Sequence, residues 1–221
     1  MPQHLGHSLK LLKNNLLTLM EYTEQTVDLA LQAVADKNYD KAKEVIKSDD
    51  KIDEMEVNIE EQCLQLLALH QPVAIDLRFI ITTLKVNNDL ERIGDLAVNI
   101  SERALTLSKL DKHDAPFDFT TMASLTRNML KKAIDSLLNK DVKSAKEVCT
   151  ADDEVDKINK DMYKQICEKI NIHPERTEFY LQYLSTSRHL ERIADYATNI
   201  AEDVIYMVNG EIVRHNPDLY S

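Results

Sequence analysis

Apolar residues recur at spacings of three and four along most of the chain, which is the repeat of an amphipathic α-helix. The pattern predicts six long helices, at residues 8–36, 39–69, 73–107, 120–139, 142–170 and 174–207. The breaks between them are short. Pro72 and Pro174 each stand at one, because proline can begin a helix but cannot continue one. The pattern therefore predicts an all-α protein.

One segment of this pattern occurs twice. Residues 90–100 (LERIGDLAVNI) return as residues 190–200 (LERIADYATNI), and residues 49–53 (DDKID) return as residues 152–156 (DDEVD). Each copy thus holds three long helices joined by short connections, and such units pack as antiparallel bundles. We predict two tandem antiparallel three-helix bundles, related by a quasi-twofold internal repeat.

A polar segment that contains a proline separates the two copies. Residues 109–116 lose the helical periodicity, so the boundary is placed there. The predicted parts are a first three-helix repeat at 1–110, a linker at 111–119, a second three-helix repeat at 120–209 and a weakly ordered tail at 210–221.

Composition agrees with this fold and excludes several functions. The 221 residues include three Gly, five Pro and no Trp, so helix breakers are scarce. The formal net charge of −11 disfavours binding to nucleic acid or to an anionic membrane. No uncharged apolar stretch approaches the roughly 18 residues that span a bilayer, so no membrane insertion is expected. Three cysteines without a C-x-x-C pair suggest a reducing, cytosolic compartment.

An acidic stripe repeats on the helix side that faces away from the predicted core. Glu91 and Asp95 stand one turn apart, opposite Ile93 and Ala97 on a helical wheel. Three more pairs have this spacing: Asp49/Asp53, Asp152/Asp156 and Glu191/Asp195. Carboxylates one turn apart repel each other by about 0.2–0.5 kcal/mol per pair. Their recurrence indicates that something offsets the repulsion.

Cation binding is the physical candidate, because carboxylates from two neighbouring helices can surround a hard or borderline metal ion. The eight paired carboxylates are the predicted metal ligands, with supporting oxygens from Asn99, Asn199, Glu102 and Glu202. A site away from the core should be shallow and exposed, suited to binding or sensing. The alternative is a solvated helix face whose charge Arg92 and Arg192 neutralise.

The sequence holds no catalytic signature. Its three glycines cannot form a P-loop, and neither H-E-x-x-H nor G-x-S-x-G occurs. No histidine stands three residues after a glutamate, so the ligand motif of ferritin-like di-iron bundles is missing. We therefore expect no enzymatic activity. Gly94, which costs a helix about 1 kcal/mol relative to alanine, is attributed to close helix packing.

Residues 71–80 (QPVAIDLRFI), 88–95 (NDLERIGD) and 189–200 (HLERIADYATNI) resemble the PhoU family of phosphate-uptake regulators, and the resemblance extends over essentially the whole chain. It implies a cytoplasmic, all-α and usually homodimeric protein that negatively regulates the phosphate regulon. Such proteins are adaptors between the ATPase of the phosphate ABC transporter and a sensor histidine kinase, with no established catalysis.

The resemblance also bears on the acidic stripe. Some family members hold iron or another metal on E(D)-x-x-x-D motifs, which the four carboxylate pairs match. Iron is thus the first expectation, with zinc, manganese, magnesium and calcium as alternatives. Ala194 replaces the usual glycine and His189 replaces Asp89, which puts the equivalence of the two copies in question. Two rival functions stay open, a metal-binding or storage protein and a metal-free helical scaffold.

Overall fold

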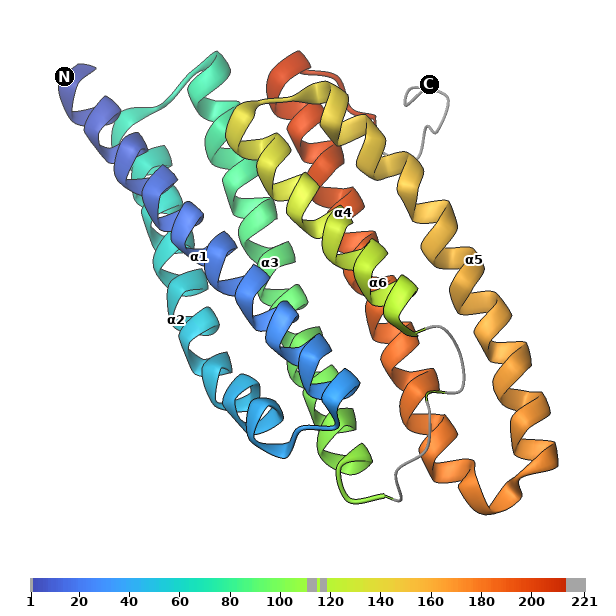
Figure 1. Cartoon of the computed structure of the whole chain (residues 1–221). Coiled ribbons are helices and arrows are strands. Elements are labelled where there is room, and N and C mark those ends of the chain that lie inside the picture. The colour runs from blue at the N-terminus through green and yellow to red at the C-terminus, as the bar shows by residue number, and fades with distance from the viewer. Residues whose placement is uncertain (1, 111–114, 116–118, 214–221) are drawn as a thin grey trace.

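The computed structural model describes residues 2–110, 115 and 119–213, and nearly all of these residues are helical. The elements are α1 (Pro2–Asp36), α2 (Tyr39–His70), α3 (Ala74–Leu107), α4 (Phe119–Asn139), α5 (Val142–Ile172), the 3₁₀ turn η1 (Pro174–Arg176) and α6 (Thr177–Asn209). Helices α1 to α3 form one antiparallel bundle, and α4 to α6 form a second bundle beside it (Figure 1). The predicted all-α fold of six long helices is confirmed.

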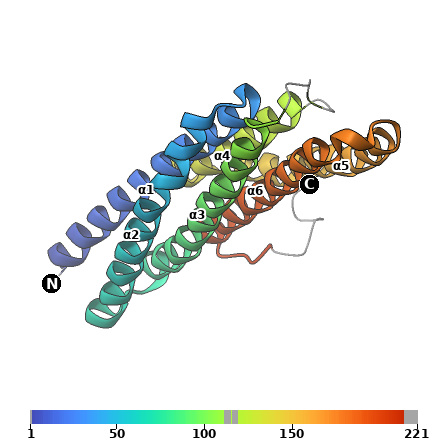
Figure 2. The same cartoon turned by 90° about the horizontal axis from the view of Figure 1, so that it is seen from below.

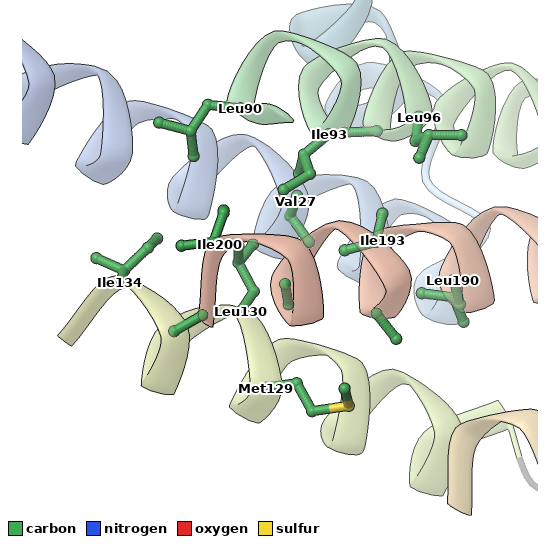
Figure 3. Close-up of a cluster of buried hydrophobic side chains, with 14 of the residues drawn as sticks. Val27, Leu90, Ile93, Leu96, Met129, Leu130, Ile134, Leu190, Ile193 and Ile200 are labelled. Atoms are coloured by element: carbon green, nitrogen blue, oxygen red, sulfur yellow. The ribbon is translucent and has the colours of Figure 1, made fainter. Parts of the chain in front are cut away.

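The two bundles pack against each other through their last helices. Helices α3 and α6 lie side by side and run in opposite directions in the centre of the molecule, as Figures 1 and 2 show. Their buried side chains join those of α1 and α4 in one core, shown in Figure 3: Val27, Leu90, Ile93, Leu96, Met129, Leu130, Ile134, Leu190, Ile193 and Ile200. Each central helix therefore contacts three others.

The internal repeat extends to the turns. Lys37, at φ 49°, ends α1, and the side chain of Asn38 caps α2 by accepting from the backbone N–H of Lys41 at 3.0 Å. In the second copy Lys140, at φ 55°, ends α4, and Asp141 caps the first turn of α5. Asn and Asp are preferred helix caps, because their short side chains reach the unpaired N–H groups of the first turn. Both connections can therefore be very short.

The helix ends differ from the sequence prediction where the tertiary fold extends or tightens them. Helix α1 begins at Pro2, because Leu5 and Leu9 pack against the core. Pro174 begins a 3₁₀ turn, and α6 starts three residues later. Val213, in the predicted tail, is buried. Most of the predicted linker, residues 111–114 and 116–118, and the tail from residue 214 lie outside the described residues. Among the described helices, none has the length and apolar character needed to cross a membrane.

Candidate functional site

The four predicted carboxylate pairs gather in two clusters, one in each repeat. The first-repeat cluster joins α2 to α3 and consists of Asp49, Asp53, Glu91 and Asp95. The second-repeat cluster joins α5 to α6 and consists of Asp152, Asp156, Glu191 and Asp195. In each cluster, two i, i+4 pairs on neighbouring helices lie close enough to perturb each other's ionisation.

Burial and mutual repulsion disfavour the charged form of the first-repeat cluster. Partial burial raises the pKa of Asp49 above its ordinary value, and the carboxylates of Asp53 and Asp95 raise it further. Partial burial also raises the pKa of Glu91, while Arg92 opposes that shift. The Arg92 Nε atom lies 3.3 Å from Glu91 Oε2, and its Nη1 atom lies 3.3 Å from Asp95 Oδ2. One arginine therefore neutralises part of this cluster.

The second-repeat cluster is perturbed more strongly. Burial, followed by the charges of Asp195 and Asp156, raises the pKa of Asp152 to about 7. Its Oδ1 atom is buried and has no hydrogen-bond partner. Burial also raises the pKa values of Glu191 and Asp195, and Arg192 opposes both shifts. Within the described residues Arg192 forms no ion pair, in contrast to Arg92 in the first repeat.

The prediction of a shallow, exposed site is only partly correct. Asp53 and Asp195 are exposed, but the other six members are half-buried: Asp49, Glu91, Asp95, Asp152, Asp156 and Glu191. A helical wheel treats the side opposite the core stripe as solvent. Helices α3 and α6 instead each contact three other helices, so part of that side is covered. The clusters thus line the seams between α2 and α3 and between α5 and α6.

The four supporting oxygens take different positions. Asn99 and Asn199 are half-buried on α3 and α6, one turn beyond the clusters. Glu102 is exposed and its Oε2 atom lies 3.0 Å from Arg103 Nη2. The prediction that Glu202 lies on the solvated stripe is wrong, because this side chain is buried. Helix α6 turns it inward between its neighbours. Burial raises the pKa of the Cys149 thiol, and the charge of Glu202 raises it further.

A polar contact that the sequence argument missed ties the helices together beside each cluster. The buried Asn87 Nδ2 group donates to the Glu56 carbonyl oxygen at 2.9 Å and to its Oε1 atom at 3.3 Å. In the second repeat, Ser187 Oγ donates to Asn159 Oδ1. Partial burial raises the pKa of Glu56, so it acts as a fifth carboxylate of the first-repeat cluster. Glu56 stands three residues after Asp53, and this spacing places the two side chains side by side on one helix face.

The oxygen-only donor sets have the chemistry that hard and borderline cations require. The unpartnered Asp152 Oδ1 atom and the mutual repulsion of the carboxylates fit a cation as well, because a positive charge would relieve both. No three His, Cys, Asp or Glu side chains of the described part of the chain are arranged around one metal position. The predicted ligand set therefore stays a prediction.

Comparison with known proteins relates this architecture to one family. The PhoU domain matches residues 16–104 and 119–204, once in each repeat. A PhoU homologue of Clostridium acetobutylicum is 33% identical over 93% of this chain and 94% of its own length. One from Thermotoga maritima is 34% identical over 94% and 90%. The crystal structure of PhoU from Pseudomonas aeruginosa superposes with a TM-score of 0.89 at 34% identity, over 93% of this chain and 99% of that one.

The PhoU structure from Streptococcus pneumoniae gives a TM-score of 0.83 at 30% identity, over 95% of this chain and 99% of the other. Sequence and structure thus agree over nearly the full length of each protein. The domain match once in each repeat agrees with the duplicated three-helix layout, and the chain belongs to the PhoU family.

Proposed function

We propose that this protein negatively regulates phosphate uptake and phosphate-regulon signalling, as a cytoplasmic adaptor between the ATPase of the phosphate ABC transporter and a sensor histidine kinase. Membership of the PhoU family is the observation that carries the proposal. The relatives from C. acetobutylicum and T. maritima are named accessory proteins of the phosphate-specific transport system. Family membership thus supports a role in the regulation of phosphate transport, to which the proposal adds the two partners.

The duplicated architecture suits an adaptor. An adaptor needs two protein-binding surfaces on one rigid body, and the tandem repeat presents two related acidic seams joined by a shared core. With a net charge of −11, the protein should favour basic surfaces on its partners. Added salt should then slow association, because it screens exposed charges over about 8–10 Å at physiological ionic strength. The protein is proposed to act without catalysing a reaction.

We assign the carboxylate clusters a supporting role as cation sites. The eight paired carboxylates would hold the ion, which would supply positive charge between side chains that repel each other. Iron is the first candidate from family resemblance, with zinc, manganese, magnesium or calcium as alternatives. A bound cation would hold α2 against α3 and α5 against α6, and so fix the surface offered to a partner. Stoichiometric metal without partner binding would favour a storage protein instead.

A homodimer is part of the proposal. Large apolar side chains are exposed around the connection between α2 and α3, where Leu64, Leu69 and Val73 are 54%, 75% and 74% exposed. Exposed apolar groups that gather in one place commonly mark protein contacts. Sedimentation of the protein and of a Leu69→Glu/Val73→Glu variant tests this part. A monomeric variant supports a dimer contact at this end, and an unchanged dimer contradicts it.

Partner capture tests the adaptor directly. The purified protein is immobilised, and the transporter ATPase and the cytoplasmic part of the sensor kinase are offered separately and together. Simultaneous binding of both is expected. An Asp95→Asn/Asp195→Asn variant should bind less if the clusters organise the docking surface. An Asp50→Asn/Asp153→Asn variant, which removes equal charge from exposed neighbouring positions, is the matched control. Failure to capture either partner would contradict the adaptor proposal.

A further inference from the structure

A pocket lies where the two repeats meet at one end of the molecule. Its volume is about 400 Å³, and it is bounded by the first turns of α3, the last turn of α6, the beginning of α1 and the α4–α5 turn. These segments come together at the top of Figure 1. Much of the wall is apolar, with Ile75 and Phe79 from α3 and Met207 from α6. The pocket thus has both the size and the mainly apolar lining of small-molecule sites.

The polar groups of this pocket are mostly cations. Lys10, Lys13, Arg78 and Lys140 line it, against the single carboxylate of Asp76. Within the described residues, none of the four cations forms an ion pair. Four unpaired positive side chains around one hollow are unexpected in a chain of net charge −11, because acidic neighbours are abundant. The pocket therefore attracts anions, whereas the carboxylate clusters attract cations.

Arg78 is held in place at the pocket wall. Its Nε group donates to the carbonyl oxygen of Met207 at 3.2 Å, in the last turn of α6. Carbonyl groups of a last helical turn lack partners within the helix, so they accept readily from an arginine. The Nε contact fixes the planar guanidinium, whose remaining N–H groups are suited to bidentate binding of a phosphate or carboxylate. The contact between α3 and α6 thus also positions the guanidinium of Arg78 for anion binding.

The internal repeat allows the pocket to be compared with the equivalent place at the other end of the molecule. At the opposite end of the molecule, Lys37 Nζ lies 5.1 Å from the centroid of the Phe179 ring. Lys140 and Phe79 are the corresponding residues of the other copy, and both line the pocket. Phe179 is only 2% exposed and packs against Tyr183, with ring centroids 5.2 Å apart. One end of the quasi-twofold fold is thus filled by aromatic rings.

The pocket end has no aromatic ring at the two equivalent positions. Tyr183 corresponds to Thr83 and Tyr180 corresponds to Ile80, so neither position supplies a ring. Phe79 is only partly buried, whereas Phe179 is enclosed. The pocket wall at this end thus carries a partly exposed phenylalanine and a lysine. The partly exposed Phe79 ring offers a planar ligand ring a surface to pack against.

We propose that this inter-repeat pocket binds a small organic polyanion with an aromatic body, of the class of nucleoside polyphosphates. The lysines and Arg78 contact the phosphate groups, and the ring packs against Phe79 and the apolar wall. Inorganic phosphate alone leaves that wall exposed to water, so it binds more weakly. Because the pocket is built from both repeats, its ligand stabilises their packing. The inference does not depend on the adaptor function.

Calorimetric titration with ATP tests the site. EDTA is included, so that no metal ion can bridge the nucleotide to a carboxylate cluster. One ATP is expected to bind per chain. Adenosine, which has the ring without the charge, and inorganic triphosphate, which has the charge without the ring, should each bind at least about tenfold more weakly if both parts of the ligand contribute. No saturable ATP binding, or equal binding of triphosphate, overturns the proposal.

Two lysine variants and one matched control locate the binding. Lys13→Gln and Lys140→Asn should each weaken ATP binding by about tenfold, the loss expected for one charge-assisted hydrogen bond. Lys37→Asn removes the same charge from the corresponding turn at the other end and should leave affinity unchanged. Both turn lysines have positive φ, which asparagine tolerates well, so the fold is kept. Equal loss in all three variants overturns the assignment.

Partner capture distinguishes this proposal from the adaptor function. If ATP does not bind, but Lys13→Gln and Lys140→Asn reduce capture of the ATPase or kinase, the pocket receives an acidic protein segment and the nucleotide proposal is wrong. If ATP binds and the partners are not captured, the adaptor function is wrong and the pocket assignment holds. The two failures therefore give different results.

Discussion

The side chain of Ile52 occupies the space that Gly94 leaves by lacking a Cβ atom. A Cβ atom built on Gly94 would lie 2.8 Å from Ile52 Cδ1 and 3.2 Å from its Cγ2 atom, both closer than van der Waals contact. Helices α2 and α3 thus approach each other closely between the carboxylate pairs of the first-repeat cluster. The second repeat has Ala194 and the smaller Val155 at the corresponding positions. The prediction that Gly94 serves close packing is confirmed.

Gly94→Ala should lower the free energy of unfolding by about 1–2 kcal/mol. Overpacking of this kind costs about 1–3 kcal/mol, and alanine returns up to about 1 kcal/mol through its higher helix propensity. Ile52→Val should reduce this cost in the double variant, because it removes the methyl group that the new Cβ would meet. Urea unfolding of both single variants and the double variant measures the coupling. If the two single substitutions change the free energy of unfolding additively in the double variant, residues 52 and 94 are not in contact.

Ala194→Gly is the matched control in the second repeat. Both Ala194 and Val155 are fully buried, and the alanine is already accommodated there. Its replacement should therefore cost about 1 kcal/mol of helix propensity with no relief of strain. If Ala194→Gly instead stabilises the protein, the second repeat is overpacked between Ala194 and Val155.

Loss of the ion pair between the repeats should destabilise the protein more than loss of an exposed ion pair. Lys85 Nζ on α3 lies 2.9 Å from Asp203 Oδ1 on α6, and the Asp203 side chain is only 2% exposed. Lys85→Met removes this cation from the buried carboxylate, which should cost about 1.5–3 kcal/mol, as for a hydrogen bond to a charged group. The exposed pair of Lys41 and Asp36 provides the comparison, because Lys41→Met should cost less than about 1 kcal/mol. Thermal unfolding measures both variants, and equal losses of stability would contradict the difference between the two ion pairs.

The sequence predicts the features that depend on neighbours along the chain. Helix α2 and helix α5 begin at the predicted residues, because Asn38 and Asp141 cap them locally. The ion pair of Lys85 and Asp203 instead joins residues 118 positions apart, and the inward turn of Glu202 depends on which helices surround α6. Spacing fixes the angle of a side chain on its own helix. It does not determine which other helix packs against that side chain.

The same limit separates the two candidate sites. The carboxylate pairs can be found from spacing, since each pair lies on one helix and repeats at a constant offset. The anion pocket brings α1 and α3 of one repeat to the α4–α5 turn and α6 of the other. Its cations have no common spacing in the sequence. Only the packing of α3 on α6 shows that they share a hollow.

The stability of the metal-free protein should fall with rising pH because of Asp152. Its pKa is about 7 in the folded protein, against an ordinary value of 3.8 that the unfolded chain should show. Between these values the folded state binds the proton that the unfolded state has released, so stability is greatest at the acidic end and is lost as pH rises towards about 7. Melting temperatures measured in EDTA from pH 4.5 to 8 test the effect.

Asp152→Asn isolates that contribution. The amide carries no charge at any pH, so the variant should be more stable than the natural protein at pH 8 and nearly equal to it at pH 4.5. Asp153→Asn is the control, because that neighbouring side chain is exposed. Identical pH profiles for the natural protein and Asp152→Asn would show that the carboxyl is ionised normally.

Neutralising one carboxylate in each cluster should abolish metal binding. The protein is reconstituted with iron, manganese, magnesium, zinc and calcium in turn, dialysed and analysed for bound metal beside an Asp95→Asn/Asp195→Asn variant. Stoichiometric metal is expected in the natural protein and not in the variant, because oxygen ligands for these ions must be charged or strongly dipolar.

The response to pH separates specific sites from a diffuse ion atmosphere. A cation must displace the proton of Asp152, so metal should raise the melting temperature more at pH 8 than at pH 6 and should release protons on binding. The Asp50→Asn/Asp153→Asn variant removes equal charge outside the clusters and should keep its metal. If it loses metal to the same extent as Asp95→Asn/Asp195→Asn, net charge alone attracts the ions. The two seams are then acidic docking surfaces, and regulation has to act through partner contacts without a metal.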